Sequence, residues 1–410
     1  MGEDNSIRFV RFIAIFLVVV FPILLCSLEG AVAQPAWSSG DSASYGNWNL
    51  VWEYALDHPV KKVSVSPDGN YVAVVCDNWN WEYSQNESLC VLTSNGEPVW
   101  KNDSYSLFGK YNWIHDVSVS EEATYMAVGS EDETYLLHRN GSIVWKKQIK
   151  GRNLAAISSD GNCVAVGTCL EQLSYLDKDR QELWNFSAQD SIMSVAVSAN
   201  GQYIAAGGSE GNVYLLNNEG NLLWNRSLSY GFAYVAISLN GEFIGAAVNG
   251  EIGILNRSGS WTLNPLDIHH QVTSISIAME GNLLFVATED GGLCIYDETG
   301  ESVGFFETGG KTVDVDSTPD GAYVVVGSDS CVYSLERVVV PEFPELAVMP
   351  FFIIATLLAT VVCRPKHGFT QDMPSQFSNF RVGYQVSEAK NRQFKRAVKI
   401  HDWVCRISSI

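Results

Sequence analysis

The sequence predicts an all-β fold, a seven-bladed β-propeller of four-stranded blades closed by an N-terminal strand. Five glycines, Gly161, Gly201, Gly241, Gly281 and Gly321, recur at a constant interval of 40 residues, which indicates an internal repeat. Within the repeats, short apolar runs are separated by turn signals such as Asn-Gly and Glu-Gly. Four short strands repeated about every 40 residues are typical of a propeller blade.

The clearest repeat, residues 193–224, predicts four strands in order. Its first strand alternates apolar with small residues, and the pair Asn200-Gly201 then supplies a tight hairpin turn. Its second strand, residues 203–206, is apolar on both faces, so we expect burial on both sides. Its fourth strand carries Trp224, whose large ring can wedge against the neighbouring blade.

The number of repeats predicts seven blades. Sets of first, second and third strands begin near Val63, Val117, Leu154, Val195, Val235, Ile275 and Val313. The last set has no fourth strand, whereas residues 50–54 form an isolated fourth strand with Trp52 in the place of Trp224. Pairing this strand with the last blade would close the ring and remove exposed sheet edges.

The ends of the chain predict an exported, membrane-anchored protein. Arg8 and Arg11 precede an uncharged run and a small-x-small cleavage site, as in a secretory signal, with an uncleaved anchor as the alternative. Near the C-terminus, an uncharged run long enough to cross a bilayer is followed by basic residues, which predicts contact with the lipid bilayer and a tail inside the cell. The predicted segments are a signal peptide (1–33), a linker (34–46), the propeller (47–337), a Pro-containing linker (338–345), a transmembrane helix (346–363) and a basic cytoplasmic tail (364–410).

The composition argues against a nucleic-acid partner. The net charge is −20, whereas binding to phosphates requires a basic surface. Residues 364–410 are the exception, with nine basic and three acidic side chains. We therefore predict a protein or a carbohydrate as the partner.

Several motifs resemble known families. The segment from Val63 to Gly69, preceded by His58, resembles the first strand and turn of WD-repeat propellers, although no Trp-Asp dipeptide ends a repeat. The segment from Gly211 to Trp224 resembles the docking motif of propellers of the quinoprotein type, which bind pyrroloquinoline quinone. The string Val340-Pro-Glu-Phe-Pro344, ahead of an apolar run, is similar to the C-terminal anchoring signals of archaeal surface proteins.

The quinoprotein resemblance implies an oxidoreductase with a vicinal cysteine pair, a calcium shell and, in some members, a Cys-x-x-Cys-His haem site. None of these strings occurs in the chain, and neither do the usual hydrolase and nucleotide-binding motifs. We therefore predict no catalytic residue, no cofactor and no enzyme activity.

Two groups of potential metal ligands have structural alternatives. Alternating oxygens similar to a calcium loop occur at Asp314, Asp316, Thr318 and Asp320. The last of these, with Gly321, is also the hairpin turn of the repeat. Histidines at or just before first strands are expected near one rim of the channel but lack ligand spacing: His58, His115, His269 and His270. We therefore predict no metal site.

Two kinds of covalent modification are expected outside the cell. Cys76 and Cys90 bracket one loop and are the best candidates for a disulfide. For the other four cysteines of the propeller, a buried free thiol is at least as good an interpretation as a disulfide. Sequons for N-glycosylation occur at Asn86, Asn102, Asn140, Asn185, Asn225 and Asn256.

Large aromatic residues mark a candidate binding surface. Blade 1 has a long insertion between its second and third strands, and an aromatic-rich connection leads into blade 2. In a propeller these two kinds of connection share one face. The candidate residues are Trp79, Trp81, Tyr83, Tyr105, Phe108, Tyr111 and Trp113. They would stack on sugars or hold a partner, unless the rings only pack the loops together.

Together these observations predict a membrane-anchored extracellular propeller that binds protein or glycan, or acts as a scaffold, without catalysis. A structural glycoprotein of the cell envelope is the first alternative. A propeller enzyme, either a quinoprotein-like oxidoreductase or a hydrolase, is the second.

Overall fold

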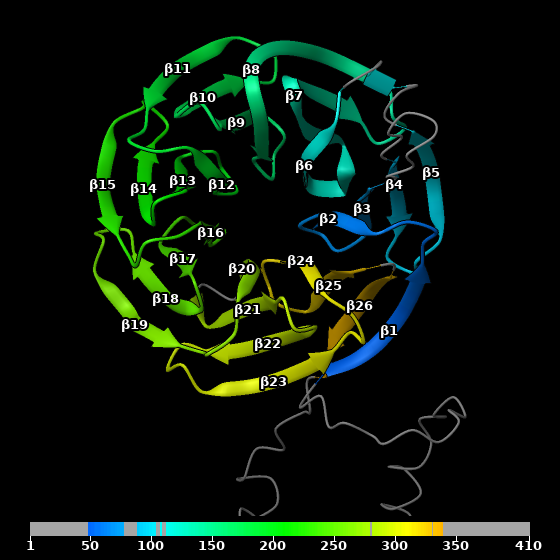
Figure 1. The fold of residues 1–410 in the computed structure, drawn as a ribbon. Helices are drawn as coiled ribbons and strands as arrows, with labels where there is room; N and C mark the ends of the chain where they lie inside the picture. The colour runs from blue at the N-terminus through cyan, green and yellow to red at the C-terminus, as the bar shows by residue number, and fades with distance from the viewer. Residues whose placement is uncertain are drawn as a thin grey trace, which may run out of the picture. The chain divides into compact units, whose positions relative to one another are not determined.

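The computed structural model describes residues 48–77, 88–103, 107–108, 112–278, 281–329 and 331–338. These residues form 26 β-strands and a short 3-10 helix, η2 (Glu121–Ala123). The strands build antiparallel sheets arranged around a central channel, with the first strand of each sheet beside the channel and the last at the outer rim (Figure 1).

Five sheets have four strands and one has six. From the channel outward, the first four-stranded sheet contains β2 (Val60–Val65), β3 (Tyr71–Cys76), β4 (Ser88–Thr93) and β5 (Pro98–Asp103). In the same direction, the second contains β12 (Ile192–Val197), β13 (Tyr203–Gly208), β14 (Asn212–Asn217) and β15 (Leu222–Ser227), and the third contains β16 (Ala233–Ile237), β17 (Phe243–Val248), β18 (Glu251–Asn256) and β19 (Trp261–Asp267). The fourth contains β20 (Val272–Ala278), β21 (Leu283–Thr288), β22 (Gly292–Asp297) and β23 (Ser302–Glu307). The fifth consists of β24 (Thr312–Ser317), β25 (Tyr323–Ser328), β26 (Cys331–Arg337) and β1 (Trp48–Ala55). The six-stranded sheet contains β6 (Ile114–Val119), β7 (Tyr125–His138), β8 (Ile143–Ile157), β9 (Cys163–Thr168), β10 (Gln172–Asp177) and β11 (Glu182–Ser187).

The prediction of seven separate four-stranded blades is wrong, because the strands form six sheets. The repeat predicts a break between the second and third blades, but β8 is continuous there. It pairs with β7 from Ile143 to Arg152 and with β9 from Asn153 to Ile157. β8 turns at Gly151 and β7 at Asp132, each with a positive φ, so the chain changes direction without a loop that would interrupt the sheet.

The membrane-spanning helix predicted at residues 346–363 lies outside the described residues. The same is true of the signal peptide (1–33), the linkers at 34–46 and 339–345, and the tail (364–410). In the part of the chain that the structure describes, no helix is both long and apolar enough to cross a bilayer. The fold class of the described residues is therefore corrected from seven blades to an all-β propeller of six sheets.

The ring is closed by strands from the two ends of the propeller. β1 pairs with β26 along its length, with Leu50 opposite Leu335 and Tyr54 opposite Val332. The isolated N-terminal strand therefore completes the last sheet, as its tryptophan predicts. This pairing covers an edge of the sheet that would otherwise present unpaired backbone groups.

Tryptophans on the outer strands join neighbouring sheets. The indole of Trp224 in β15 donates a hydrogen bond of 2.9 Å to the carbonyl oxygen of Arg257 in the next sheet, and its ring lies against Gly259. A Cβ at Gly259 would lie 3.0 Å from that ring, so the turn needs glycine. Trp52, Trp100 and Trp184 make equivalent indole hydrogen bonds to the next sheet, and Trp145 makes one within the six-stranded sheet. The predicted wedge between neighbouring units is confirmed.

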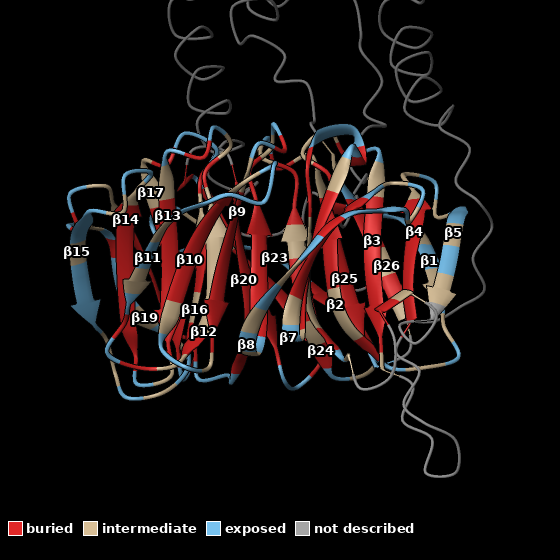
Figure 2. Cartoon of the chain, turned by 90° about the horizontal axis from the view of Figure 1, so that it is seen from above, coloured by how far each residue is buried: buried red, intermediate tan, exposed pale blue. Residues whose placement is uncertain are grey.

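The regular glycine spacing has a steric cause. Gly241 has a φ of +68°, and a Cβ at this position would lie 2.5 Å from Cδ2 of Tyr203 in the preceding sheet. Both the backbone conformation and the lack of space therefore exclude a side chain. Most buried apolar side chains lie on the second and third strands of the sheets, where neighbouring sheets pack together. The outer strands and the connections at both ends of the strands are more exposed (Figure 2).

Candidate functional site

The connections at the two ends of the strands form two different faces. We define the loop face as the described residues of the connections at one end of the strands, together with the bend of β8 at 150–151: 56–59, 77, 112–113, 150–151, 169–171, 188–191, 209–211, 228–232, 249–250, 268–271, 289–291, 308–311 and 329. Backbone hydrogen bonds join the connections between second and third strands to those between one sheet and the next, as between Leu228 and Gly211 and between Ile268 and Gly250. We define the turn face as the hairpin turns at the opposite end: 66–70, 94–97, 139–142, 158–162, 178–181, 198–202, 218–221, 238–242, 257–260, 298–301 and 318–322.

A cavity of about 460 Å³ follows the central channel. It is lined by β2, β6, β8, β12, β16, β20 and β24. The six-stranded sheet contributes two of these strands, β6 and the second half of β8. Residues at equivalent positions of these strands therefore lie at the same level of the channel, although they are far apart in the sequence.

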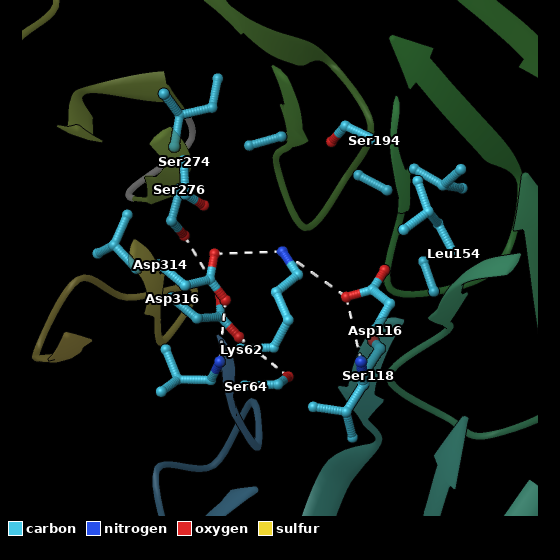
Figure 3. Close-up of a pocket in the computed structure, with 18 of the residues that line it drawn as sticks. Lys62, Ser64, Asp116, Ser118, Leu154, Ser194, Ser274, Ser276, Asp314 and Asp316 are labelled. Carbon is cyan, nitrogen blue, oxygen red and sulfur yellow. Dashed lines mark hydrogen bonds and ion pairs between the residues drawn. The ribbon is translucent and has the colours of Figure 1, made fainter. Parts of the chain in front are cut away.

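Two levels of side chains form most of the wall. The level nearer the loop face contains Lys62, Asp116, Leu154, Ser194, Tyr234, Ser274 and Asp314. The next level contains Ser64, Ser118, Ala156, Ala196, Ala236, Ser276 and Asp316. The charged residues come from β2, β6 and β24, whereas β8, β12 and β16 contribute mainly apolar groups, so the channel has a charged half and an apolar half (Figure 3).

Lys62 lies at the centre of the charged half. Its Nζ is 3.2 Å from Oδ1 of Asp314 and 3.7 Å from Oδ1 of Asp116, and 31 % of its side chain is exposed. Burial lowers the pKa of Lys62, but the two carboxylates outweigh burial and raise the pKa above its usual value. Lys62 therefore stays a charged ammonium at neutral pH and is not available there as a base or a nucleophile.

The channel carboxylates also hold the neighbouring first strands. Asp314 accepts a hydrogen bond of 2.9 Å from the backbone N–H of Val63, and Asp316 accepts one of 2.9 Å from Val65. Asp116 accepts one of 3.2 Å from Ala155 in the second half of β8. These side chains pair N–H groups at the inner edges of sheets, which would otherwise lack a partner strand.

Two of these carboxyl groups are poised to titrate near pH 6. Burial raises the pKa of Asp116 to about 6, with Lys62 acting against this rise and Asp314 adding to it. Burial also raises the pKa of Asp316 to about 6, against the backbone hydrogen bond from Val65. The charge of the channel therefore changes over mildly acidic pH.

His115 lies beside the cluster and is held neutral. Its Nε2 is 2.9 Å from Oε2 of Glu131. Burial lowers the pKa of His115 to about 4, helped by the positive charges of Lys61 and Arg152 and opposed by Glu131.

The other potential metal ligands considered from the sequence do not converge with His115. Thr318 donates a hydrogen bond of 2.6 Å to Asp320 within a hairpin turn, while Asp314 and Asp316 face the channel. His269 pairs with Asp267, and His270 pairs with Asp290. Across residues 48–338, leaving out those that the structure does not describe, no group of three or more His, Cys, Asp or Glu side chains is arranged to hold a metal ion.

Most of the predicted aromatic surface lies outside the described residues: Trp79, Trp81, Tyr83, Tyr105 and Tyr111. Phe108 is buried and packs on Tyr135, with 4.2 Å between ring centroids. Trp113 lies on the loop face with 36 % of its surface exposed. Thus one of the two described rings belongs to the core and the other to the surface.

Two further aromatic rings on the same face are exposed, and neither was predicted from the sequence. Tyr230 is 78 % exposed and Phe232 is 53 % exposed, both in the connection between β15 and β16. Leu170, between β9 and β10, is 55 % exposed. The string Ser-Tyr-Gly-Phe at residues 229–232, two aromatics in a short connection, is the signal that would have identified this loop.

The candidate modification sites are distributed as follows. Cys76 and Cys90 are buried free thiols on adjacent strands, where Cys76 is opposite Ser88 and Cys90 is opposite Val74, so the two are diagonal neighbours. The two thiols share a hydrogen bond, which lowers the pKa of Cys76 and raises the pKa of Cys90, and the disulfide between them stays a prediction. Among the sequons, Asn140, Asn185 and Asn225 are exposed, Asn102 and Asn256 are half-buried, and Asn86 lies outside the described residues.

Comparison with known proteins agrees with the strand arrangement. Residues 85–259 match a PQQ-type family model described as "Outer membrane protein assembly factor BamB", a match that covers less than half of the chain. No curated protein matches the chain. The ring of antiparallel sheets shows that the protein is a β-propeller, and residues 85–259 of this ring are similar to PQQ-type repeats.

Proposed function

We propose that this protein is an exported, non-catalytic binding or scaffold module that docks a partner protein on its loop face. The observation that carries the proposal is the position of the exposed apolar side chains. Among the described residues, the three most exposed large apolar side chains are Tyr230, Leu170 and Phe232, and all three lie on the loop face. Large aromatic side chains supply much of the binding energy at protein interfaces.

The chemistry of the channel supports a role without catalysis. Lys62 is held between two carboxylates, and its raised pKa keeps it protonated. The carboxylates of Asp116, Asp314 and Asp316 accept hydrogen bonds from backbone groups of neighbouring strands. These groups are engaged in joining the sheets, so we assign them to the stability of the ring.

Two further observations support a protein partner outside the cytoplasm. The matched family model carries the description of an assembly factor, which favours contact with other proteins. Residues 1–33 have the pattern of a secretory signal, and the sequon residues Asn185 and Asn225 are exposed on the outer strands β11 and β15.

Site-specific photo-crosslinking in cells tests this proposal. A photoreactive amino acid at position 230 on the loop face should give discrete protein adducts on gels, identified by mass spectrometry. The matched control carries the same amino acid at Thr299 on the turn face and should give few or none. Equal adducts at both positions, or none at position 230, would contradict docking on the loop face.

A further inference from the structure

We infer that the mouth of the channel at the loop face binds a carboxylate carried by an extended segment of the partner protein, with Arg152 as its main contact. This inference rests on the proposed function and specifies the chemistry of the docked segment. The carboxylate belongs either to an acidic side chain or to the C-terminus of the partner. Both sources present the same planar anion, and the experiment below separates them.

The first argument is a local reversal of charge. The whole chain has a net charge of −20, yet the lysines and arginine that line the channel are grouped at one end: Lys61, Lys62, Arg152 and Lys311. Lys61 and Lys62 lie near the start of β2, Lys311 lies just before β24, and Arg152 lies just before the second half of β8, so all four are at the end beside the loop face. The lining residues at the turn-face end are uncharged: Pro67, Ser159, Ala199, Leu239 and Pro319. An anion is therefore drawn to the loop-face mouth in particular.

The second argument is that the basic side chains at the loop-face mouth differ in the ion pairs that they form. Lys62 is held by Asp314 and Asp116, and Lys311 is 2.7 Å from Glu289. Arg152 is exposed, and within the described residues it forms no ion pair. A guanidinium group binds a carboxylate through two parallel hydrogen bonds, which makes Arg152 the group best suited to this ligand.

The third argument concerns depth and shape. Asp116 and Asp314 lie at the level of Lys62 and Asp316 lies at the next level, so all three are farther into the cavity than Arg152. They would repel an anion, so the carboxylate stays at the mouth beside Arg152. A cationic ligand entering from the loop face would have to pass Lys61, Arg152 and Lys311 before it reached these aspartates. Beside Arg152, the wall formed by Leu154 and Met193 is apolar and can contact the methylene groups of an extended segment.

Fluorescence anisotropy with the purified full-length protein tests the inference. The probe is a fluorescein-labelled Glu-rich peptide of about twelve residues, compared with a Gln-rich peptide of equal length. Each peptide is made with a free and with an amidated C-terminus. We expect the Glu-rich peptide to bind and to weaken with added salt, because the contact is ionic. Loss of binding on amidation would assign the site to a chain terminus, and retention would assign it to acidic side chains.

Variants of Arg152 make the test specific. Arg152→Gln should weaken binding about tenfold or more, as expected for loss of hydrogen bonds to a charged group. Arg152→Lys should restore part of the affinity, and Arg180→Gln, a matched change on the turn face, should leave it unchanged. Melting curves show whether Arg152→Gln is folded. If it is not folded, the affinity of Arg152→Lys and the weakening of peptide binding by salt test the inference instead.

The inference is overturned if Glu-rich and Gln-rich peptides bind equally, if none binds, or if a folded Arg152→Gln variant binds like the wild type. Its failure is distinct from failure of the proposed function. Adducts at position 230 that persist in Arg152→Gln would show that a protein docks on the loop face without a carboxylate at the channel.

Discussion

The turn face and the loop face are built from the same repeat, but they use it differently. On the turn face the same contacts recur: the side chains of Ser66, Ser158 and Thr318 each donate a hydrogen bond to the aspartate two residues later. On the loop face, the connections vary in length and sequence and carry the most exposed apolar side chains. The ring therefore has its repeated stabilising contacts at one end of its strands. The connections at the other end can vary, and they are the ones that we propose to bind a partner.

The largest effect is expected from a tryptophan at the turn face. Trp52→Ala removes the ring that packs on Gly96 and the indole hydrogen bond of 2.6 Å to the Ser94 carbonyl oxygen. Because Trp52 lies in the strand that closes the ring, we expect a loss of about 4 kcal/mol in the free energy of unfolding. Urea denaturation measures this loss. An unchanged midpoint and slope would mean that closure does not depend on this contact.

The next effect compares one glycine from each face. Gly241 on the turn face and Gly309 on the loop face have similar φ angles, +68° and +71°. A Cβ at Gly241 would lie 2.5 Å from the Tyr203 ring, whereas a Cβ at Gly309 would have no atom within 4 Å. Gly309→Ala should therefore cost only the backbone strain, about 1 kcal/mol. Gly241→Ala should cost about 3 kcal/mol in total, because the ring must also move. Equal losses in paired denaturation curves would contradict the steric argument.

A pH series examines the buried charges beside the loop face. The pKa of His115 is lowered to about 4 in the folded protein, so its contribution to stability is complete above its usual pKa of about 6.5 and is lost as the pH falls through 4. The pKa values of Asp116 and Asp316 are raised to about 6, so their contributions have the opposite sign: they are complete below pH 3.8 and are lost as the pH rises through 6.

Replacing His115 separates its contribution to the pH dependence of stability from the opposite contributions of Asp116 and Asp316. Relative to the wild type, His115→Asn should gain about 2 kcal/mol of stability between pH 7 and pH 4, because it no longer takes up a proton on unfolding. Urea denaturation at pH 7, 5.5 and 4 gives this difference, with His115→Gln as a second variant. A difference that does not change with pH would show that His115 does not titrate as its burial indicates.

The smallest effect is expected from the exposed aromatic rings. Tyr230→Ser combined with Phe232→Ser should change the free energy of unfolding by less than about 0.5 kcal/mol, because exposed side chains contribute little to folding. The same double variant should reduce crosslinking to the partner from a neighbouring position such as Ser229. A large loss of stability would place these rings in the structural part of the loop face.

The regular part of the fold was predictable because each repeat carries its own local signals. The glycine of each Asn-Gly or Asp-Gly turn requires a positive φ, and the tryptophans at the end of the repeat mark the contact between sheets. The continuity of β7 and β8 was not predictable, because β7 turns at Asp132, a residue without glycine's conformational freedom. No turn signal in the sequence distinguishes this position from an ordinary loop.

The channel cluster was harder to predict because its members are distant in the chain. Lys62 and Asp314 are separated by 252 residues, yet they occupy the same position of their first strands. Aligning the repeats shows the available signal: charged residues stand here where other repeats have Leu154 or Ser194. Asp314 also fits the pattern of a calcium loop in the sequence, and this pattern hides its position in the first strand. Phe108 was expected at the surface because the length of its connection hid its contact with Tyr135.

Closure of the ring by β1 and β26 has a kinetic consequence. β1 is synthesised first, but its partner strand begins at Cys331, so about 275 residues must be made before the two can meet. At a translation rate of about 5–20 residues per second, β1 waits for roughly 15–55 s. During this interval the growing chain exposes an apolar strand with unpaired backbone groups at one end and an open sheet edge at the other. The most vulnerable period of this protein is therefore its biogenesis, when a chaperone that holds residues 48–55 would prevent aggregation between unfinished rings.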